Sequence, residues 1–310
     1  MSVRSGEDSY YIRSRDMKLF CRLWKPLQPQ GLILFLHGAG EHSGQYSHLG
    51  MECLQRSVAF IAPDLRGFGR SGGRRGYIRQ FKDYLDDLDE VVGQLQIQFS
   101  ELPIFLFGHS LGGLVAVRYA QQFCDRVTGV ILSSPALGIR LKFPNFMKKS
   151  VNLVSLLAPA LPVELVKWNE ALRKRKCLQS RLPDWTSNLL IDPLTTVHYT
   201  PRWFSELINN GTKALSEVNR FRCPILCLYD RYDRIVNSNA IEQFFASIAS
   251  DEKNCFVLTK GNHQFLNDGE VLRYIFQWLN TRLGGLSAEL RDSADQASPA
   301  AGTIRAPASR

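Results

Sequence analysis

The sequence predicts an α/β fold, with a mostly parallel β-sheet, helices on both of its faces and an inserted helical cap. Short apolar runs that are typical of buried strands alternate with longer amphipathic segments that are typical of helices. This alternation stops between Leu137 and Gly211 and then resumes. With 310 residues, 45% of them hydrophobic, the chain is long enough to bury one large core.

The strands are predicted from runs of apolar and β-branched residues. Two opening strands, Tyr10–Ser14 and Leu19–Trp24, are joined by a turn at Arg15-Asp16. Leu32–Leu36 and Val58–Ala62 are apolar throughout, as expected for strands that are buried on both faces. The further predicted strands are Leu32–Leu36, Val58–Ala62, Ile104–Phe107, Val127–Leu132, Ile225–Tyr229 and Cys255–Leu258.

Three helices stand out between these strands. From Tyr84 to Phe99, apolar residues recur at helical spacing with acidic residues between them, which predicts an amphipathic helix. The segment Leu111–Phe123 predicts a second helix, directly after a strand. A closing helix is indicated by apolar residues from Val271 to Leu279.

The break in the pattern divides the chain. Residues 1–136 and 212–283 form the predicted core, and residues 137–211 form the cap, inserted between the sixth and seventh strands. The cap segment is rich in Leu, Pro, Lys and Arg and is too long to be a structureless loop. Residues 284–310 are dominated by Ala, Ser, Gly and charged residues, so this tail is predicted to be disordered. The cap also contains Trp168, Trp185 and Trp203.

The formal net charge of +9 is compatible with three kinds of partner: nucleic acid, an anionic membrane surface or an acidic substrate. The basic residues are scattered, with local runs at Arg173–Lys176 and Lys148-Lys149, and no aromatic-interleaved RNA motif accompanies them. This distribution argues against nucleic-acid binding and favours a solvated charged surface.

The seven cysteines are odd in number and widely spread, mostly in apolar runs, which indicates free thiols in a reducing compartment. Cys223 and Cys227 lie at a predicted strand and have no partners at zinc-finger spacing, so no metal site is expected. Met1–Asp16 is polar and contains neither a signal peptide nor a membrane span. We therefore predict a cytoplasmic protein.

The sharpest motif is Gly108-His109-Ser110-Leu111-Gly112-Gly113, between a predicted strand and a predicted helix. In this context G-x-S-x-G forms a nucleophile elbow, a strained turn that lifts the serine hydroxyl above the sheet. Gly108 and Gly112 would allow the strand and the helix to approach closely. The helix N-terminus behind Ser110 favours developing negative charge.

A serine nucleophile needs a base, and the base needs an acid to orient it. In this fold the order along the chain is serine, acid, histidine. His263 follows the last strand and is the histidine best placed after the cap. The acid is predicted to be Asp233, with Asp230 as the fallback, since both follow the strand Ile225–Tyr229.

The tetrahedral intermediate also needs hydrogen-bond donors for its oxyanion. One predicted donor is the backbone N–H of Leu111, the residue after the nucleophile. The other is assigned to Ala39, in the loop His37-Gly38-Ala39-Gly40 after the third strand, where small residues allow close backbone approach.

Taken together, these motifs resemble the monoacylglycerol lipase and lysophospholipase branch of the α/β-hydrolases. Their order and spacing fit the family from about residue 32 to residue 265. His37–Gly44 is the stretch most specific to this branch. The resembling stretches are His37–Gly44, Asp64–Ser71, Gly108–Gly113, Ser133–Leu137, Asp192-Pro193-Leu194 and Asp233–Val236.

The resemblance implies an eight-stranded sheet, a cap over an apolar acyl tunnel, and hydrolysis of fatty-acid esters without a cofactor. Its triad maps onto Ser110, Asp233 and His263. It places Glu41 near the polar, glycerol-facing end of the site. Gly38 and His109 are expected beside it as further substrate-binding residues. Two positions depart from the family's pattern: Asp230 replaces a common glycine, and Gln45 replaces an arginine found in some relatives.

The sequence therefore predicts a serine hydrolase that cleaves a monoacylglycerol or a lysophospholipid through an acyl-enzyme. The alternatives are a carboxylesterase of small esters, a peptidase, or a scaffold that has lost the chemistry. Within the cap, Val151–Val166 is strongly apolar and has basic flanks at 140–149 and 167–181. These features suit transient contact with an anionic membrane surface, although the leucines could instead pack the cap onto the body.

Overall fold

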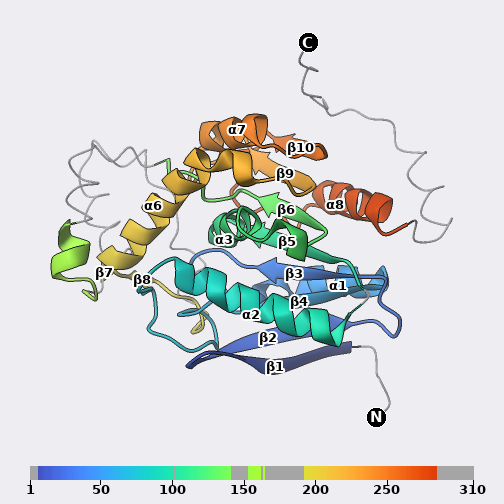
Figure 1. Cartoon of the computed structure of the whole chain (residues 1–310), viewed down its shortest axis with the longest axis horizontal. Helices are drawn as coiled ribbons and strands as arrows, with labels where there is room; N and C mark the ends of the chain where they lie inside the picture. The colour runs from blue at the N-terminus through green and yellow to red at the C-terminus, as the bar shows by residue number, and fades with distance from the viewer. Residues whose placement is uncertain (1–5, 101, 141–152, 162, 165–191, 285–310) are drawn as a thin grey trace.

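The computed structural model describes residues 6–100, 102–140, 153–161, 163–164 and 192–284 (Figure 1). An eight-stranded sheet runs through this part of the chain. Its strands are β1 (Gly6–Ser14), β2 (Met17–Lys25), β3 (Gly31–Leu36), β4 (Val58–Pro63), β5 (Ile104–His109), β6 (Gly129–Ser133), β9 (Ile225–Asp230) and β10 (Lys253–Leu258).

The strands lie in the order β1-β2-β4-β3-β5-β6-β9-β10. β2 pairs antiparallel with both β1 and β4, and every other pair in this sheet is parallel. β3, β4, β5, β6 and β9 are buried along their whole length, which explains their continuous apolar sequences. The predicted α/β-hydrolase fold is confirmed.

Helices cover both faces of the sheet (Figure 1). They are α1 (Ser47–Gln55), α2 (Lys82–Gln98), α3 (Leu111–Ala120), α6 (Pro201–Ser216), α7 (Ser238–Ser247) and α8 (Gly269–Arg282). α2, α3 and α7 pack in one apolar core with Leu34 of β3, and α1 and α8 pack in the other with Phe35. Successive residues of one strand thus bury opposite faces, as the pleat requires. Three short 3₁₀ helices lie at Ser43–Tyr46, Cys124–Arg126 and Val218–Arg220.

The segment predicted to be a cap lies largely outside the described residues, as do Trp168, Trp185, Cys177, both basic runs and nearly all of the predicted tail. α6 begins inside the predicted cap and crosses its predicted boundary at residue 211. This helix packs against α3, and Trp203 at its start donates a hydrogen bond from Nε1 to the Tyr84 hydroxyl at 3.1 Å. Trp203 thus belongs to the body of the protein, and composition alone gave no sign of this.

Two short strands also occur where the sequence showed none. β7 (Val163–Glu164) and β8 (His198–Tyr199) pair antiparallel and are separate from the main sheet. Neither has more than two residues, so no alternating pattern could reveal them. In the part of the chain that the structure describes, no helix is both long and apolar enough to cross a membrane.

Candidate active site

The turn between β5 and α3 carries Ser110. Its backbone has φ 50° and ψ −112°, a conformation that side-chain-bearing residues rarely adopt. Hydrogen bonds hold it on both sides: Ser110 N–H donates to Ser133 O at 2.9 Å, and Ala136 N–H donates to Ser110 O at 2.9 Å. The neighbouring strand thus over-determines a strained turn at the N-terminus of α3, as expected for a functional position.

Close packing explains the glycines around this turn. A Cβ atom on Gly108 would lie 2.3 Å from the carbonyl oxygen of Gly112, and one on Gly112 would lie 2.1 Å from that of Leu36. Both distances are well below van der Waals contact, so larger residues would push α3 away from the sheet. The close approach predicted for Gly108 and Gly112 is present.

His263 and Asp233 form a hydrogen-bonded pair. His263 Nδ1 lies 2.7 Å from Asp233 Oδ2, while Asp233 Oδ1 accepts from the N–H groups of Ile235 at 2.7 Å and Val236 at 3.1 Å. Burial raises the pKa of Asp233, but the hydrogen bonds from His263 and the two N–H groups outweigh it and hold the pKa below its usual value. The buried carboxylate therefore stays ionised and orients the imidazole.

Asp230, the alternative acid, has different partners. Its carboxylate accepts hydrogen bonds from the backbone N–H groups of Tyr232 at 2.8 Å, Lys260 at 2.9 Å and Asn262 at 3.1 Å. These contacts join the loop after β9 to the loop after β10, which carries His263. The structure pairs His263 with Asp233, and it gives Asp230 a role in fastening the histidine loop.

Ser110 and His263 lie at the same edge of the sheet. β5, β6, β9 and β10 are parallel neighbours, so the loops at their carboxyl ends meet there. The rings of His263 and His109 are 5.0 Å apart, which places the imidazole of His263 beside the residue that precedes Ser110. Ligands bind at this edge in open α/β sheets.

The loop after β3 passes along the same turn. Leu36 is the parallel partner of Gly108, and Gly112 N–H donates to His37 O at 3.1 Å. A Cβ atom on Gly38 would lie 3.2 Å from the ring of His109. The structure thus brings the loop with Gly38 and Ala39 next to the turn with Ser110 and Leu111, as the sequence predicted.

Two residues that sequence reasoning overlooked anchor this loop. The buried ring of His37 donates from Nδ1 to Gly38 O at 2.7 Å and accepts at Nε2 from Leu65 N–H at 2.9 Å. Asp64 accepts from Ser43 N–H and Arg70 N–H, both at 2.7 Å. The sequence signals were that both residues lie directly after buried strands and that both begin stretches that resemble the family, neither of which assigned them this role.

The same loop is attached to a segment of the predicted cap, at Asp192–Thr196. Nε2 of His42 lies 2.6 Å from Oδ2 of Asp192, and Thr196 N–H donates to Gly40 O at 2.9 Å. Gly40 has φ 85°, which a glycine adopts without cost. Asp192-Pro193-Leu194, noted above only for its resemblance, therefore supports the loop that carries Ala39.

Glu41 is buried behind this loop. Its Oε2 accepts from Gly38 N–H at 2.6 Å and from the Tyr46 hydroxyl at 2.7 Å, and its Oε1 accepts from the side chain of Gln264. His109 is fully buried beside it, and its Nδ1 lies 3.1 Å from Ser133 Oγ. Burial lowers the pKa of His109 to about 4, so this ring is neutral at neutral pH.

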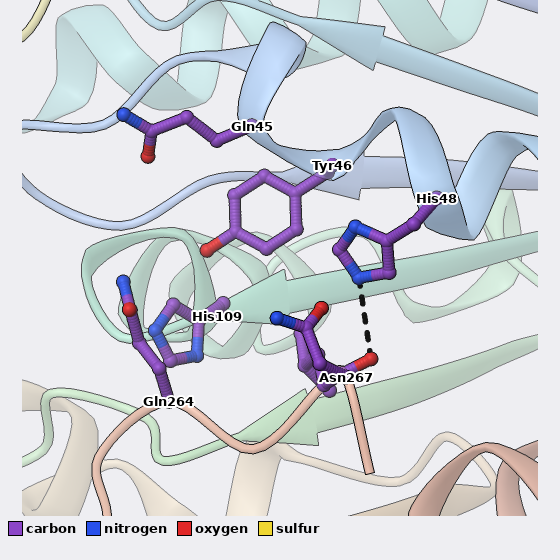
Figure 2. A pocket seen from close by; sticks show the side chains of 7 residues that line it. Gln45, Tyr46, His48, His109, Gln264 and Asn267 are labelled. Carbon is purple, nitrogen blue, oxygen red and sulfur yellow. Dashed lines mark hydrogen bonds between the residues drawn. The ribbon is translucent and has the colours of Figure 1, made fainter. Parts of the chain in front are cut away.

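A small polar pocket opens next to these residues (Figure 2). Its volume is about 80 Å³, and the Tyr46 hydroxyl, the His109 ring and the Gln264 amide point toward one another within it. The lining residues are Gln45, Tyr46, His48, His109, Gln264, Leu266 and Asn267.

No cluster of three or more His, Cys, Asp or Glu side chains within the described ranges is placed to hold a metal ion. The six cysteines of these ranges are free, and Cys223 contacts Cys124. The described residues thus bring together a strained serine, a histidine paired with a buried carboxylate, and the loop after β3.

The chain is similar to several known proteins. The family model described as serine aminopeptidase, S33 matches residues 27–270. A phospholipase of Bacillus subtilis is 29% identical over 80% of this chain and 93% of its own length. The monoglyceride lipase of Rattus norvegicus is 29% identical over 88% of this chain and 90% of its own.

Among solved structures, the monoacylglycerol lipase of Paleococcus ferrophilus superposes with a TM-score of 0.71 at 26% identity, covering 85% of this chain and 98% of that one. The resemblance inferred from the motifs is thereby confirmed. This chain belongs to the serine aminopeptidase S33 family of the α/β-hydrolase superfamily, in the branch of the monoacylglycerol lipases.

Proposed function

We propose that this chain hydrolyses fatty-acid monoesters of glycerol, with Ser110 as nucleophile, His263 as general base and Asp233 as the acid that orients it. The observation that carries this proposal is the buried Asp233–His263 pair at the sheet edge where Ser110 occupies its strained turn. Related lipases, esterases and a phospholipase support ester hydrolysis as the reaction.

The reaction proceeds in two halves. His263 takes the proton of the Ser110 hydroxyl while Oγ attacks the ester carbonyl, and the N–H groups of Ala39 and Leu111 stabilise the oxyanion. The imidazolium then protonates the leaving alcohol oxygen, leaving an acyl-enzyme. Water, deprotonated by His263, releases the fatty acid and restores Ser110.

We propose that the alcohol of the ester binds in the small pocket, because two of its lining residues, His109 and Gln264, directly adjoin Ser110 and His263 in the sequence. Among the residues that the structure describes, those that line it are uncharged polar side chains, two histidines and one leucine, without a carboxylate, lysine or arginine. Such a lining offers hydrogen bonds to hydroxyl groups but no ion pair for a phosphate or a choline. We therefore place monoacylglycerol ahead of lysophospholipid.

The description of the family also suggests a second candidate function, that of an aminopeptidase. A peptide's α-ammonium group needs acceptors in the site, preferably a carboxylate. Glu41 lies behind the pocket with both oxygens already accepting hydrogen bonds from the protein. This arrangement favours an ester over a peptide.

The test compares wild type with Ser110→Ala on monooleoylglycerol, oleoyl lysophosphatidylcholine and p-nitrophenyl butyrate. We expect the highest kcat/KM for monooleoylglycerol and loss of all three activities in the variant. Turnover of p-nitrophenyl butyrate alone would instead indicate a small-ester carboxylesterase. A fully active Ser110→Ala would refute the nucleophile, and a wild type inert to a fluorophosphonate probe would indicate a scaffold.

We further propose that the segment 153–161 contacts lipid surfaces. Its side chains Leu156 and Leu157 are 70% and 78% exposed, and Leu153 and Leu161 are also exposed. Basic residues flank it in the sequence, which suits an anionic bilayer. Equal binding to anionic and neutral liposomes at low salt would refute this proposal.

A further inference from the structure

One buried carboxylate joins the two loops on which the proposed chemistry depends. Oε2 of Glu41 accepts from Gly38 N–H at 2.6 Å, and Gly38 directly precedes the proposed oxyanion donor Ala39. Oε1 of the same carboxylate accepts from the side chain of Gln264, which directly follows the proposed base His263. These two contacts connect segments that are 223 residues apart in the sequence.

Glu41 is placed behind the pocket and not in its lining. Its side chain is 10% exposed, and its neighbours Tyr46, His109 and Gln264 all line the pocket. The Tyr46 hydroxyl donates to Oε2 at 2.7 Å, and His109 Nε2 lies 3.8 Å from Oε1. Both oxygens of the carboxylate thus accept hydrogen bonds from the protein itself.

The environment keeps this carboxylate charged. Burial raises the pKa of Glu41, but its surroundings, including hydrogen bonds from the Tyr46 hydroxyl and the Gly38 N–H, outweigh it and place the pKa below its ordinary value. Hydrogen bonds to an ionised acceptor are about twice as strong as neutral ones. An ionised Glu41 therefore holds both loops more firmly than a neutral side chain of the same shape would.

We propose that Glu41 is a positioning residue, which fixes the Ala39 N–H and the His263 imidazole relative to Ser110 and does not bind the alcohol of the substrate. This inference rests on the proposed function, because it assumes that Ala39 and His263 act on the ester. It differs from the role in glycerol binding that the sequence resemblance suggested for Glu41.

The proposal predicts a defect that does not depend on the leaving alcohol. Both the oxyanion donor and the base act on every ester, so their misplacement should lower kcat and leave KM nearly unchanged. Displacement of reacting groups by about 1 Å costs on the order of 10²-fold in rate. We expect Glu41→Ala to lower kcat about 100-fold for both monooleoylglycerol and p-nitrophenyl butyrate.

Glu41→Gln provides the conservative comparison. Its amide oxygen can still accept from Gly38 N–H, whereas the charge and one acceptor are lost, so we expect a smaller loss of about 10-fold in kcat. Glu90→Gln is the matched control, because Glu90 is exposed on α2 and accepts a hydrogen bond from Gln94 there. The kinetics of this variant should equal those of wild type. Denaturant midpoints show which variants are folded, and Glu41→Gln keeps the test valid if Glu41→Ala does not fold.

The two esters separate the possible outcomes. Similar kcat losses on both substrates, with Glu41→Gln between Glu41→Ala and wild type, would support positioning. A higher KM for monooleoylglycerol alone would overturn the proposal and make Glu41 a glycerol ligand. Unchanged kinetics in both variants would overturn it as well. A wild type that cleaves only p-nitrophenyl butyrate contradicts the proposed substrate, but the short ester still tests the role of Glu41.

Discussion

Single residues decide which of two neighbouring carboxylates takes part in the chemistry. Asp230 ends β9 and Asp233 lies three residues further on; both are fully buried, but they bind different partners. Asp233 contacts the ring of His263. Asp230 instead accepts hydrogen bonds from backbone N–H groups of the loop that carries His263. The contact of Asp233 orients the imidazole of His263, and the contacts of Asp230 stabilise the loop that carries His263.

We therefore expect Asp233→Asn and Asp230→Asn to fail differently. Asp233→Asn should lower kcat about 10⁴-fold, because the amide favours the wrong tautomer of the imidazole. Asp230→Asn should lower the free energy of unfolding by about 1–3 kcal/mol with a much smaller loss of kcat. Kinetics on p-nitrophenyl butyrate and urea denaturation of both variants measure this difference, and the reverse ranking of kcat would make Asp230 the acid.

At the scale of the elements, the site depends on how closely α3 lies against β3 and β5. Gly112 makes this approach possible, since its Cα faces the carbonyl oxygen of Leu36. Gly93 is also helical, on α2, but a Cβ atom there would meet only the end of the Arg126 side chain at 3.4 Å. A methyl group would therefore clash with backbone at Gly112, whereas it would fit at Gly93.

The matched substitutions Gly112→Ala and Gly93→Ala should have opposite effects. Gly112→Ala should destabilise the fold by about 3 kcal/mol or more through overpacking against backbone, and it should abolish esterase activity. Gly93→Ala should stabilise it by about 0.5–1 kcal/mol, because alanine loses less backbone entropy in a helix. Urea denaturation gives both values, and a stable, active Gly112→Ala would contradict the close packing of α3.

At the scale of the whole molecule, buried neutral histidines make stability depend on pH. Burial lowers the pKa of both His37 and His109, and that of His109 falls to about 4. Between an unfolded pKa of about 6.5 and this folded value, the unfolded chain binds a proton that the folded protein does not. Stability therefore falls as the pH drops through this window.

We expect the free energy of unfolding to decrease between pH 6.5 and pH 4, with His109 alone accounting for about 3 kcal/mol at most. His109→Gln removes this titration and should flatten the decrease by that amount. The measurement is urea denaturation of both proteins across the range, and carboxylates contribute equally to both curves. Parallel curves for wild type and variant would show that His109 is not the source.

The fold was largely predictable because its signals are local. Each buried strand is a short apolar run, and the elbow at Ser110 has its own motif between strand and helix. α1 escaped prediction because it buries few apolar side chains and one of its buried positions is Gly50, which packs on Trp24. The boundary predicted for the cap stays a prediction, and the contacts of α6 with α3 across it could not be foreseen from composition.

The site was predictable only in part, because chain order does not report contacts. Ser110 and His263 followed from motif and order, but the choice between Asp230 and Asp233 required the position of the His263 ring. The role of Glu41 depends on an interaction across the sheet with Gln264, which no local pattern records.

The place of the insertion has an evolutionary consequence. The chain leaves the sheet after Ser133 and returns at Ile225, yet β6 and β9 are direct parallel neighbours that pair Val130 with Ile225. The entropy of closing such an excursion grows only with the logarithm of its length, about 0.6 kcal/mol for each doubling. Insertions and deletions within this excursion should therefore be tolerated while Ser110 stays in register, provided that Asp192, Thr196 and α6, which contact the body of the protein, are kept.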